Sequence, residues 1–505
     1  MTEPPHNDSA RDPTDCAPPQ IAADIRRGLV WSSLNSLALR FGSLAVGMVL
    51  ARLLAPEDFG VYAIALTVQS VLVTLVDLGL SADLVRAADP GPRAPTVATL
   101  SLVNGVVLAL VMTIAARPVA VLMGAPGAAG VIAVLSWTLV LSSLGVVPYA
   151  KLQRGFEQRR LFGSSVADFA TGTTVTIVLI LAGMGPMALA IGRLAAQTAA
   201  TTVQFILARV RPRFAFDRGI ARSALALGVP LAGANLLSWA LLNIDNVVIA
   251  HVAGTTALGL YVLAFNVSSW PMSAIGQAVR SVSLAGFART ADGTDRGFRM
   301  AMSLTWAAAL LAGVLLAALA RPLVLLLYGS RWSASATVLA ALGLFGAVRV
   351  ALDLMATYLV ARGAARSVLY VQVVWFVALI PAVVLAARWK GIAGAGWAHV
   401  AVAALVVLPA YAVALRRVGT PPRVLMRAMA LPTLAAMPAW LAAHAAASAV
   451  DRPLPALALG GLAGLAAYLA VCGLWVRRLL PDGALRRRRA PSGLMDRSRP
   501  GQAVT

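Results

Sequence analysis

The chain has 505 residues, of which 59% are hydrophobic and only 12% are charged, and its mean hydropathy is +0.81. Soluble domains carry about twice this charged fraction, so the composition excludes an ordinary soluble protein and predicts a polytopic membrane protein built of α-helices. A net charge of +22 would indicate a nucleic-acid partner in a soluble domain, but the placement of the basic residues contradicts that interpretation here.

The first 27 residues contain Pro, Asp, Asn and Arg and lack the apolar core of a signal peptide, so we expect a disordered cytoplasmic tail. The chain has two cysteines, Cys16 in this tail and Cys472 in the last apolar run. Two cysteines placed so far apart predict neither a disulfide framework nor a metal site.

Fourteen apolar runs follow, each long enough to cross about 30 Å of hydrocarbon as a helix. We expect them at residues 28–51, 59–84, 97–116, 129–150, 162–184, 187–208, 223–250, 256–279, 300–320, 335–361, 367–387, 392–415, 428–448 and 455–476. The expected domains are an N-terminal lobe (28–208), a C-terminal lobe (223–415), an appended pair of spans (428–476) and a basic tail (477–505). We expect this basic tail in the cytoplasm, on anionic lipid headgroups.

The basic residues are distributed unevenly between the two sides that these spans define. With both termini in the cytoplasm, 32 of the 42 Lys and Arg residues lie inside, seven lie outside and three lie within spans. This distribution follows the positive-inside rule and predicts a multi-pass protein of the bacterial plasma (inner) membrane with both termini cytoplasmic. It also accounts for the net charge without a nucleic-acid partner.

A weak internal repeat relates the two expected lobes. Residues 52–65 align with residues 251–264 at an offset of 199, with Gly, Tyr and Ala in register. If the match is not chance similarity in an Ala-, Leu- and Val-rich chain, it predicts two six-helix halves with the same orientation in the membrane. Pro230 and Pro271 interrupt the seventh and eighth spans, where kinks are expected to act as hinges.

Charged side chains within apolar spans are costly and therefore mark candidate functional residues. Arg40 lies about eleven residues from either end of its span, too far to reach the surface, so it faces the interior as a cargo ligand or in an ion pair. Arg349 and Asp353 share one helix face and either pair with each other or line a cavity. Arg193 lies near the outer end of its span, where it binds cargo or reaches the headgroups.

Three further acids, Asp77, Asp168 and Asp245, lie near the ends of their spans, where they cap a helix, pair locally or line the cavity. His399 and His444 lie among Ala and Val and are expected to be hydrogen-bonded core residues. No metal-ligand cluster accompanies these charges, so neither a metal nor a cofactor is expected.

The chemistry of this set favours an anionic cargo. Arginine matches the geometry of phosphate through its planar fork, and long apolar walls suit a lipid tail, so the sequence predicts transport of a lipid-linked phosphate or pyrophosphate. The chain lacks a phosphate-binding loop for nucleotides and any paired-carboxylate or Ser/His/Asp arrangement on an outside loop. We therefore expect a transporter and not an enzyme, driven by an ion gradient, the membrane potential or consumption of the cargo outside, or uncoupled.

Two stretches resemble a known family. ARLLAPEDFGVYAIA and VDLGLSADLVR, together with GVPLAGANLLSWALLNIDNVVIAHVAGTTALGLYVLAFNV in the second half, are similar to polysaccharide repeat-unit flippases of the Wzx type, in the multidrug/oligosaccharidyl-lipid/polysaccharide exporter superfamily. The resemblance implies alternating access that moves a polyprenyl-pyrophosphate-linked oligosaccharide from the cytoplasmic to the outer leaflet, for surface or exopolysaccharide biosynthesis. It implies cargo-binding roles for Arg40, Arg349 and Arg193, contact with membrane lipids, and a polysaccharide polymerase and glycosyltransferases as partners.

Three alternatives remain open at this point. A lipid II flippase for peptidoglycan would share the fourteen spans and the interior arginines. A multidrug/cation antiporter of the same superfamily would have acidic cavity residues and usually twelve spans. A membrane glycan polymerase or ligase would need a long outside loop with catalytic residues, and no such loop occurs in the sequence.

Overall fold

The computed structural model describes residues 42–479, apart from 44, 88, 156 and 290–294. These residues form helices and connecting turns, with no strand among them, which confirms the predicted all-α class. The α-helices are α2 (Pro56–Asp77), α3 (Leu80–Arg86), α4 (Ala94–Leu122), α5 (Ala129–Ser136), α6 (Thr138–Arg154), α7 (Gln158–Leu181), α8 (Pro186–Ala208), α9 (Arg218–Arg289), α10 (Asp295–Ala318), α11 (Ala320–Leu327), α12 (Ser335–Ala361), α13 (Ala365–Val402), α14 (Leu408–Arg417), α15 (Pro422–Ser448) and α16 (Pro453–Leu479). Short segments η1 (Pro126–Ala128), η2 (Ser330–Trp332) and the π-helical η3 (Ala403–Val407) complete the order.

The helices follow the predicted apolar spans closely. α9 runs through two of them, and its backbone leaves helical angles at Gly254 (φ 85°, ψ 175°). α13 likewise contains a break at Lys390 and Gly391 before it continues into η3 and α14. By length and apolar composition, ten stretches of the described chain can cross a membrane. Two of these stretches each run through two predicted spans, the predicted span 187–208 is not among the ten, and the first span begins before residue 42. The number fourteen therefore stays a prediction.

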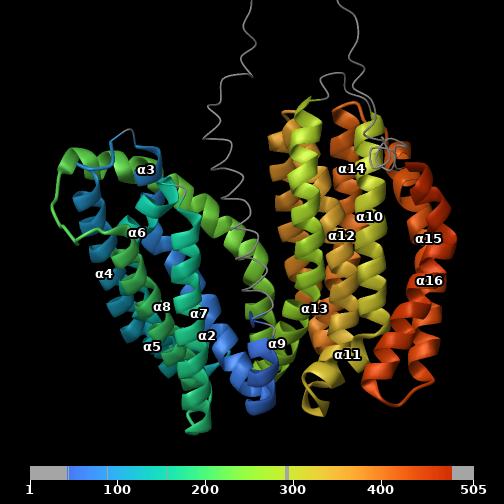
Figure 1. The fold of residues 1–505 in the computed structure, drawn as a ribbon, viewed down its shortest axis with the longest axis horizontal. Helices are drawn as coiled ribbons and strands as arrows, with labels where there is room; N and C mark the ends of the chain where they lie inside the picture. Colours follow the sequence, from blue (N-terminus) through green and yellow to red (C-terminus); the bar gives the residue numbers. More distant parts are fainter. Residues whose placement is uncertain (1–41, 44, 88, 156, 290–294, 480–505) are drawn as a thin grey trace, which may run out of the picture.

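The helices form two groups that meet at one end (Figure 1). α4 to α8 pack with one another, and most of them contact α2. α10, α12 and α13 pack on α9, α14 packs on α12 and α13, and α15 and α16 pack on α10 and α11. Figure 1 shows the first part of α9 crossing one end of the N-terminal group before it descends between the groups. This helix therefore contacts both α2 and α12.

A reciprocal glycine contact joins the two groups where α2 and α9 meet. A Cβ atom added at Gly60 would lie 1.8 Å from the backbone oxygen of Thr255, and one added at Gly259 would lie 1.8 Å from the backbone oxygen of Pro56. These residues are related by the offset of 199 found in the sequence, so the contact is the same surface used twice, as at a two-fold axis. The repeat in the sequence thus corresponds to pseudo-symmetric packing.

Aromatic and polar contacts reinforce this end of the molecule. The indole Nε1–H of Trp332 donates to the backbone oxygen of Ala51 at 2.7 Å, and the ring of Phe59 packs edge-on to the same indole at 5.1 Å. The guanidinium of Arg52 donates to the backbone oxygen of Leu326 at 3.3 Å. The contacts join helical residues before and within α2 to α11 and η2, so the closed end is the one that the charge distribution predicts to be outside.

Candidate functional site

A cavity of about 170 Å³ lies between α9 and α12. This volume exceeds what a single water molecule needs more than tenfold, so the cavity has room for a small polar group. α12 contributes two charged residues one helical turn apart, and α9 contributes hydroxyl and apolar side chains. The lining residues are Phe265, Ser268, Ser269, Met272, Ser273, Gly276, Leu342, Phe345, Gly346, Arg349, Val350 and Asp353.

Arg349 is the available cation of this cavity. Among the described residues it forms no hydrogen bond or ion pair, and Asp353, one helical turn further along α12, lines the same space. The hydroxyls of Ser269 and Ser273 donate to backbone oxygens of their own helix at 2.8 and 2.7 Å, so their oxygens face a ligand chiefly as acceptors. An anionic group in this cavity would therefore be bound mainly by the guanidinium of Arg349.

Arg193 is instead neutralised within the N-terminal group. Its Nη1 lies 3.1 and 3.2 Å from the two carboxylate oxygens of Asp168, and its Nη2 lies 3.4 Å from the Gln197 amide oxygen. The pair joins α8 to α7, and Tyr62 of α2 interacts electrostatically with both charges. The structure thus brings two of the sequence-predicted residues together, in an arrangement where each satisfies the other.

Asp77 caps a short helix. Its carboxylate accepts hydrogen bonds from the backbone N–H of Ser81 at 3.3 Å and from the Ser81 hydroxyl at 3.0 Å. The intervening Leu78 and Gly79 have positive φ angles of 41° and 68°, which form the turn between α2 and α3. This geometry assigns Asp77 to the turn and leaves it no role at the Arg349 cavity.

Asp245 lies in the interior of the C-terminal group and not on the Arg349 cavity. Its carboxylate accepts a hydrogen bond from the Tyr261 hydroxyl at 2.7 Å and lies 3.7 Å from Nε2 of His399. The Nδ1 of His399 lies 2.9 Å from the backbone oxygen of Ala395. The pattern of the sequence did not indicate this grouping, because His399 comes from a distant span, in α13.

The remaining candidates stay predictions. Arg40 lies outside the described residues. Pro230 and Pro271 fall within helical stretches of α9, whose interior departs from helical angles at Gly254, and their hinge roles stay predictions. His444 stacks on the ring of Trp440 at 5.0 Å, on α15.

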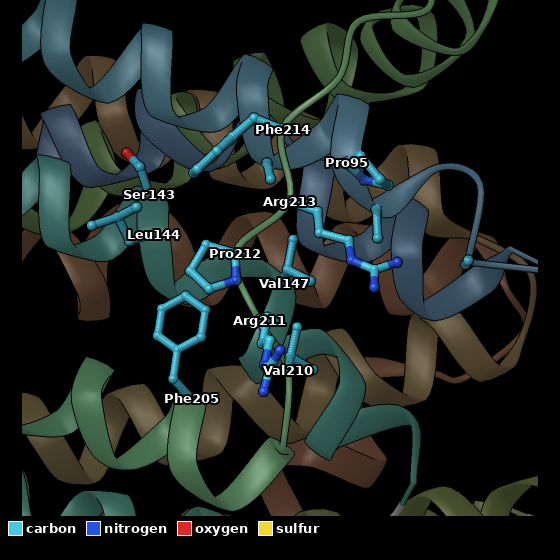
Figure 2. Close-up of a pocket in the computed structure, with 13 residues that line it drawn as sticks. Pro95, Ser143, Leu144, Val147, Phe205, Val210, Arg211, Pro212, Arg213 and Phe214 are labelled. Carbon is cyan, nitrogen blue, oxygen red and sulfur yellow. The ribbon is translucent and has the colours of Figure 1, made fainter.

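A second cavity, of about 130 Å³, lies at the end of the N-terminal group where α4, α6 and α8 meet the segment 210–214 (Figure 2). Figure 2 shows this segment running past the apolar side chains of Val147 and Phe205. The segment adds two exposed cations, Arg211 and Arg213, to a mostly apolar lining. Sequence reasoning missed this cavity, although the alternation of Arg with apolar residues in RVRPRF is a signal that could have indicated it.

Comparison with protein families and curated proteins gives one family match and several relatives. A family model described as "Polysaccharide biosynthesis protein" matches residues 49–337. The "Succinoglycan biosynthesis transport protein ExoT" of Rhizobium meliloti (strain 1021) is 28% identical over 332 residues, which are 64% of this chain and 66% of that protein. The "Lipopolysaccharide biosynthesis protein WzxC" of Escherichia coli (strain K12) is 22% identical over 73% of this chain and 76% of its own length. The "Teichuronic acid biosynthesis protein TuaB" of Bacillus subtilis (strain 168) is 22% identical, over 70% and 74%.

Two groups of solved structures share the fold. The structure titled "Lipid II flippase MurJ, inward closed conformation" superposes with a TM-score of 0.75 at 14% identity, over 90% of this chain and all of that one. An inward-facing multidrug resistance MATE family transporter of the MOP superfamily gives a TM-score of 0.61 at 16% identity, over 77% of this chain and 98% of its own. At such low identity, these similarities establish the two-lobed transporter fold alone.

Proposed function

Because the chain belongs to the polysaccharide biosynthesis protein family, we propose that it is a flippase for a polyprenyl-pyrophosphate-linked oligosaccharide. The flippase moves this lipid-linked glycan from the cytoplasmic to the outer leaflet of the bacterial plasma membrane, for surface or exopolysaccharide biosynthesis. The names of three curated relatives, which concern succinoglycan, lipopolysaccharide and teichuronic acid biosynthesis, support a polysaccharide precursor over lipid II or a drug.

The observation that carries the proposal is Arg349, which lines the cavity between α9 and α12 and forms no ion pair with any described residue. A half-buried guanidinium without a carboxylate partner is costly unless water or an anion satisfies it. Its fork matches two oxygens of a phosphate group, so the pyrophosphate is the part of the cargo that this cavity recognises. Arg193, by contrast, already has Asp168 as its partner and serves the N-terminal group.

The arrangement of the lobes supports alternating access. The two groups touch where Gly60 and Gly259 meet the opposite backbone, and they diverge toward the end that carries α3 and α14 (Figure 1). With both termini in the cytoplasm, the divergent end faces the cytoplasm, where the lipid-linked glycan is made. The cargo would then enter between an N-terminal lobe (28–208) and a C-terminal lobe (223–415), with the pair 428–476 packed at the side.

The test replaces Arg349 in a strain that depends on this protein for its surface polysaccharide. Arg349→Ala should reduce polymer output at least about tenfold, since a lost charge-assisted hydrogen bond to phosphate is worth about 1.5–3 kcal/mol, and lipid-linked repeat units should accumulate. Arg349→Lys should retain part of the output because lysine keeps the charge but loses the fork. Arg211→Ala, in the other cavity, is the matched control and should leave output unchanged.

Protein amounts in the membrane are compared by immunoblot in every strain. Normal output from Arg349→Ala at a normal protein level would refute the assignment of this cavity to the pyrophosphate. Glycosyltransferases supply the cargo, and a polysaccharide polymerase consumes it. We therefore expect the purified protein to flip the cargo in a reconstituted assay without these partners.

A further inference from the structure

A buried carboxylate in α9 has no basic partner of permanent charge. The side chain of Asp245 is 7% exposed and that of His399 is 4% exposed. Within the described part of the chain, Asp245 forms no ion pair with a lysine or an arginine. Its contacts are the Tyr261 hydroxyl at 2.7 Å, the backbone N–H of Asn246 at 3.0 Å and Nε2 of His399 at 3.7 Å.

The hydrogen bonding of His399 determines which ring nitrogen faces the carboxylate as an acceptor. A carbonyl oxygen only accepts, so Nδ1 must carry the proton that bonds the backbone oxygen of Ala395 at 2.9 Å. In the neutral ring, Nε2 is then unprotonated, and it points its lone pair toward the carboxylate of Asp245. Nε2 of His399 and the carboxylate oxygen of Asp245 lie 3.7 Å apart, and both are hydrogen-bond acceptors. One added proton would turn one of them into a donor to the other.

The apolar surroundings make this proton favourable. An ionised carboxylate beside a neutral imidazole leaves one net negative charge in the interior, and a buried charge without a counter-charge is costly. One proton on the pair makes the cluster neutral overall, either as imidazolium and carboxylate or as two uncharged groups, and it belongs to the pair rather than to either residue. Tyr261 from α9 is the other titratable group in contact, while α12 faces the imidazole with the ring of Phe345 at 5.0 Å.

The pair is connected both to the cargo cavity and to the opposite lobe. Phe345 packs on the imidazole and also lines the Arg349 cavity. The residue after Asp245, Asn246, extends its amide to the hydroxyl of Thr67 in α2 at 3.4 Å. A change of charge at Asp245 therefore acts on a segment of α9 whose next residue contacts α2 of the opposite lobe. Through His399 and Phe345, the same change is linked to the lining of the Arg349 cavity.

We propose that the Asp245–His399 pair is the binding site of a coupling proton, taken up from water on one side of the membrane and released to the other. The inference rests on the proposed flippase function for its cargo, but proton binding itself requires no cargo. The proton enters as H⁺ on the Nε2 lone pair or a carboxylate oxygen and leaves from the same site, and no other bond is made or broken. A sodium site is disfavoured, because hard cations need several oxygen ligands and this site offers one carboxylate beside an imidazole.

The experiment uses the purified full chain in lipid nanodiscs, without cargo. Spin labels on Met184→Cys and Arg331→Cys, two exposed positions on the two lobes near the closed end, report the distance between the lobes. We expect the distance distribution to shift between pH 5 and pH 8 (roughly the range in which histidine titrates) in potassium chloride, and to respond no further to sodium. Asp245→Asn and His399→Gln should abolish the shift.

The chain has four histidines, and one of them supplies a matched control. His444→Gln, which alters a histidine stacked on Trp440 in α15, should keep the shift of the wild-type protein. If either site variant fails to fold, ¹⁵N-histidine spectra of the unaltered protein replace it: His399 should show the Nδ1–H tautomer and titrate in step with the distance change.

Three results would overturn the proton site: a wild-type protein insensitive to pH, a shift that survives both site variants, or a response to sodium in place of protons. Failure of the flippase assignment is read separately, from polymer output in the Arg349→Ala strain. A pH-dependent distance together with normal export by that strain would remove the cargo assignment and leave the proton site standing.

Discussion

The reciprocal glycine contact predicts how the two lobes separate. Gly60 and Gly259 each lie against a backbone oxygen of the opposite turn, and an added Cβ at either position would lie 1.8 Å from that oxygen. Real Cβ atoms essentially never approach within 3.0 Å, and the obstacle is backbone rather than a side chain that can rotate. Gly60→Ala or Gly259→Ala therefore forces the corners apart by about 1 Å or more, as overpacking does.

The cost falls on one conformation. Overpacking a close contact costs about 1–3 kcal/mol, and here it applies only while the corners touch, so the equilibrium should move about 5- to 150-fold toward the state in which they are apart. Because the two contacts are related by the repeat, we expect the two variants to have similar effects. The double variant should not reach the sum of both effects, because separating one corner also relieves the other.

The assay is the distance between spin labels at Met184→Cys and Arg331→Cys in a cysteine-free background. Gly47→Ala is the matched control, since a Cβ there meets nothing within 4 Å, and it should leave the distance distribution unchanged. Unchanged distances in both Gly60→Ala and Gly259→Ala, with folded protein in each case, would refute the assignment of this contact as a closed gate.

Two further predictions concern the interior charges. Arg193→Ala should lower the thermal stability by no more than about 1 kcal/mol, because the pair with Asp168 is partly exposed and screened. The combined Arg193→Ala, Asp168→Ala variant should recover part of that loss in the same melting assay, and a double variant less stable than both single ones would contradict mutual neutralisation. Arg40→Ala should reduce surface polysaccharide at a normal protein level, if it binds cargo midway across its span, and normal output would exclude that role.

The helices could be predicted from apolar length because a membrane span needs about 20 apolar residues whatever it packs against. Residues 335–361 were expected as one span and form α12. The same criterion does not predict the short helices α3 and α11, which have seven and eight residues: α3 begins within the predicted span 59–84, and α11 begins at the end of the predicted span 300–320. Apolar length also does not show whether two consecutive spans form one continuous helix. α9 runs through two predicted spans, and its backbone departs from helical angles at Gly254.

Pairing between spans could not be predicted in the same way. The sequence marks Arg193 and Arg349 alike, as arginines in apolar runs. Whether each has a counter-charge depends on which helix lies beside it: α7 presents Asp168 to Arg193 at 3.1 Å, while Arg349 faces a cavity. Helix adjacency is a tertiary property, and neither periodicity nor local spacing encodes it.

The interior charges thus meet the cost of burial in three different ways, and the differences separate their roles. Arg193 and Asp168 form an ion pair that joins α8 to α7. Asp245 lies 3.7 Å from Nε2 of His399, and the two form an ion pair only when the imidazole is protonated. Arg349 forms no ion pair within the described part of the chain and lines the cavity between α9 and α12, where we propose that it binds the anionic cargo. In the flippase that we propose, these three groups would respectively hold the N-terminal lobe together, respond to a proton and bind the cargo.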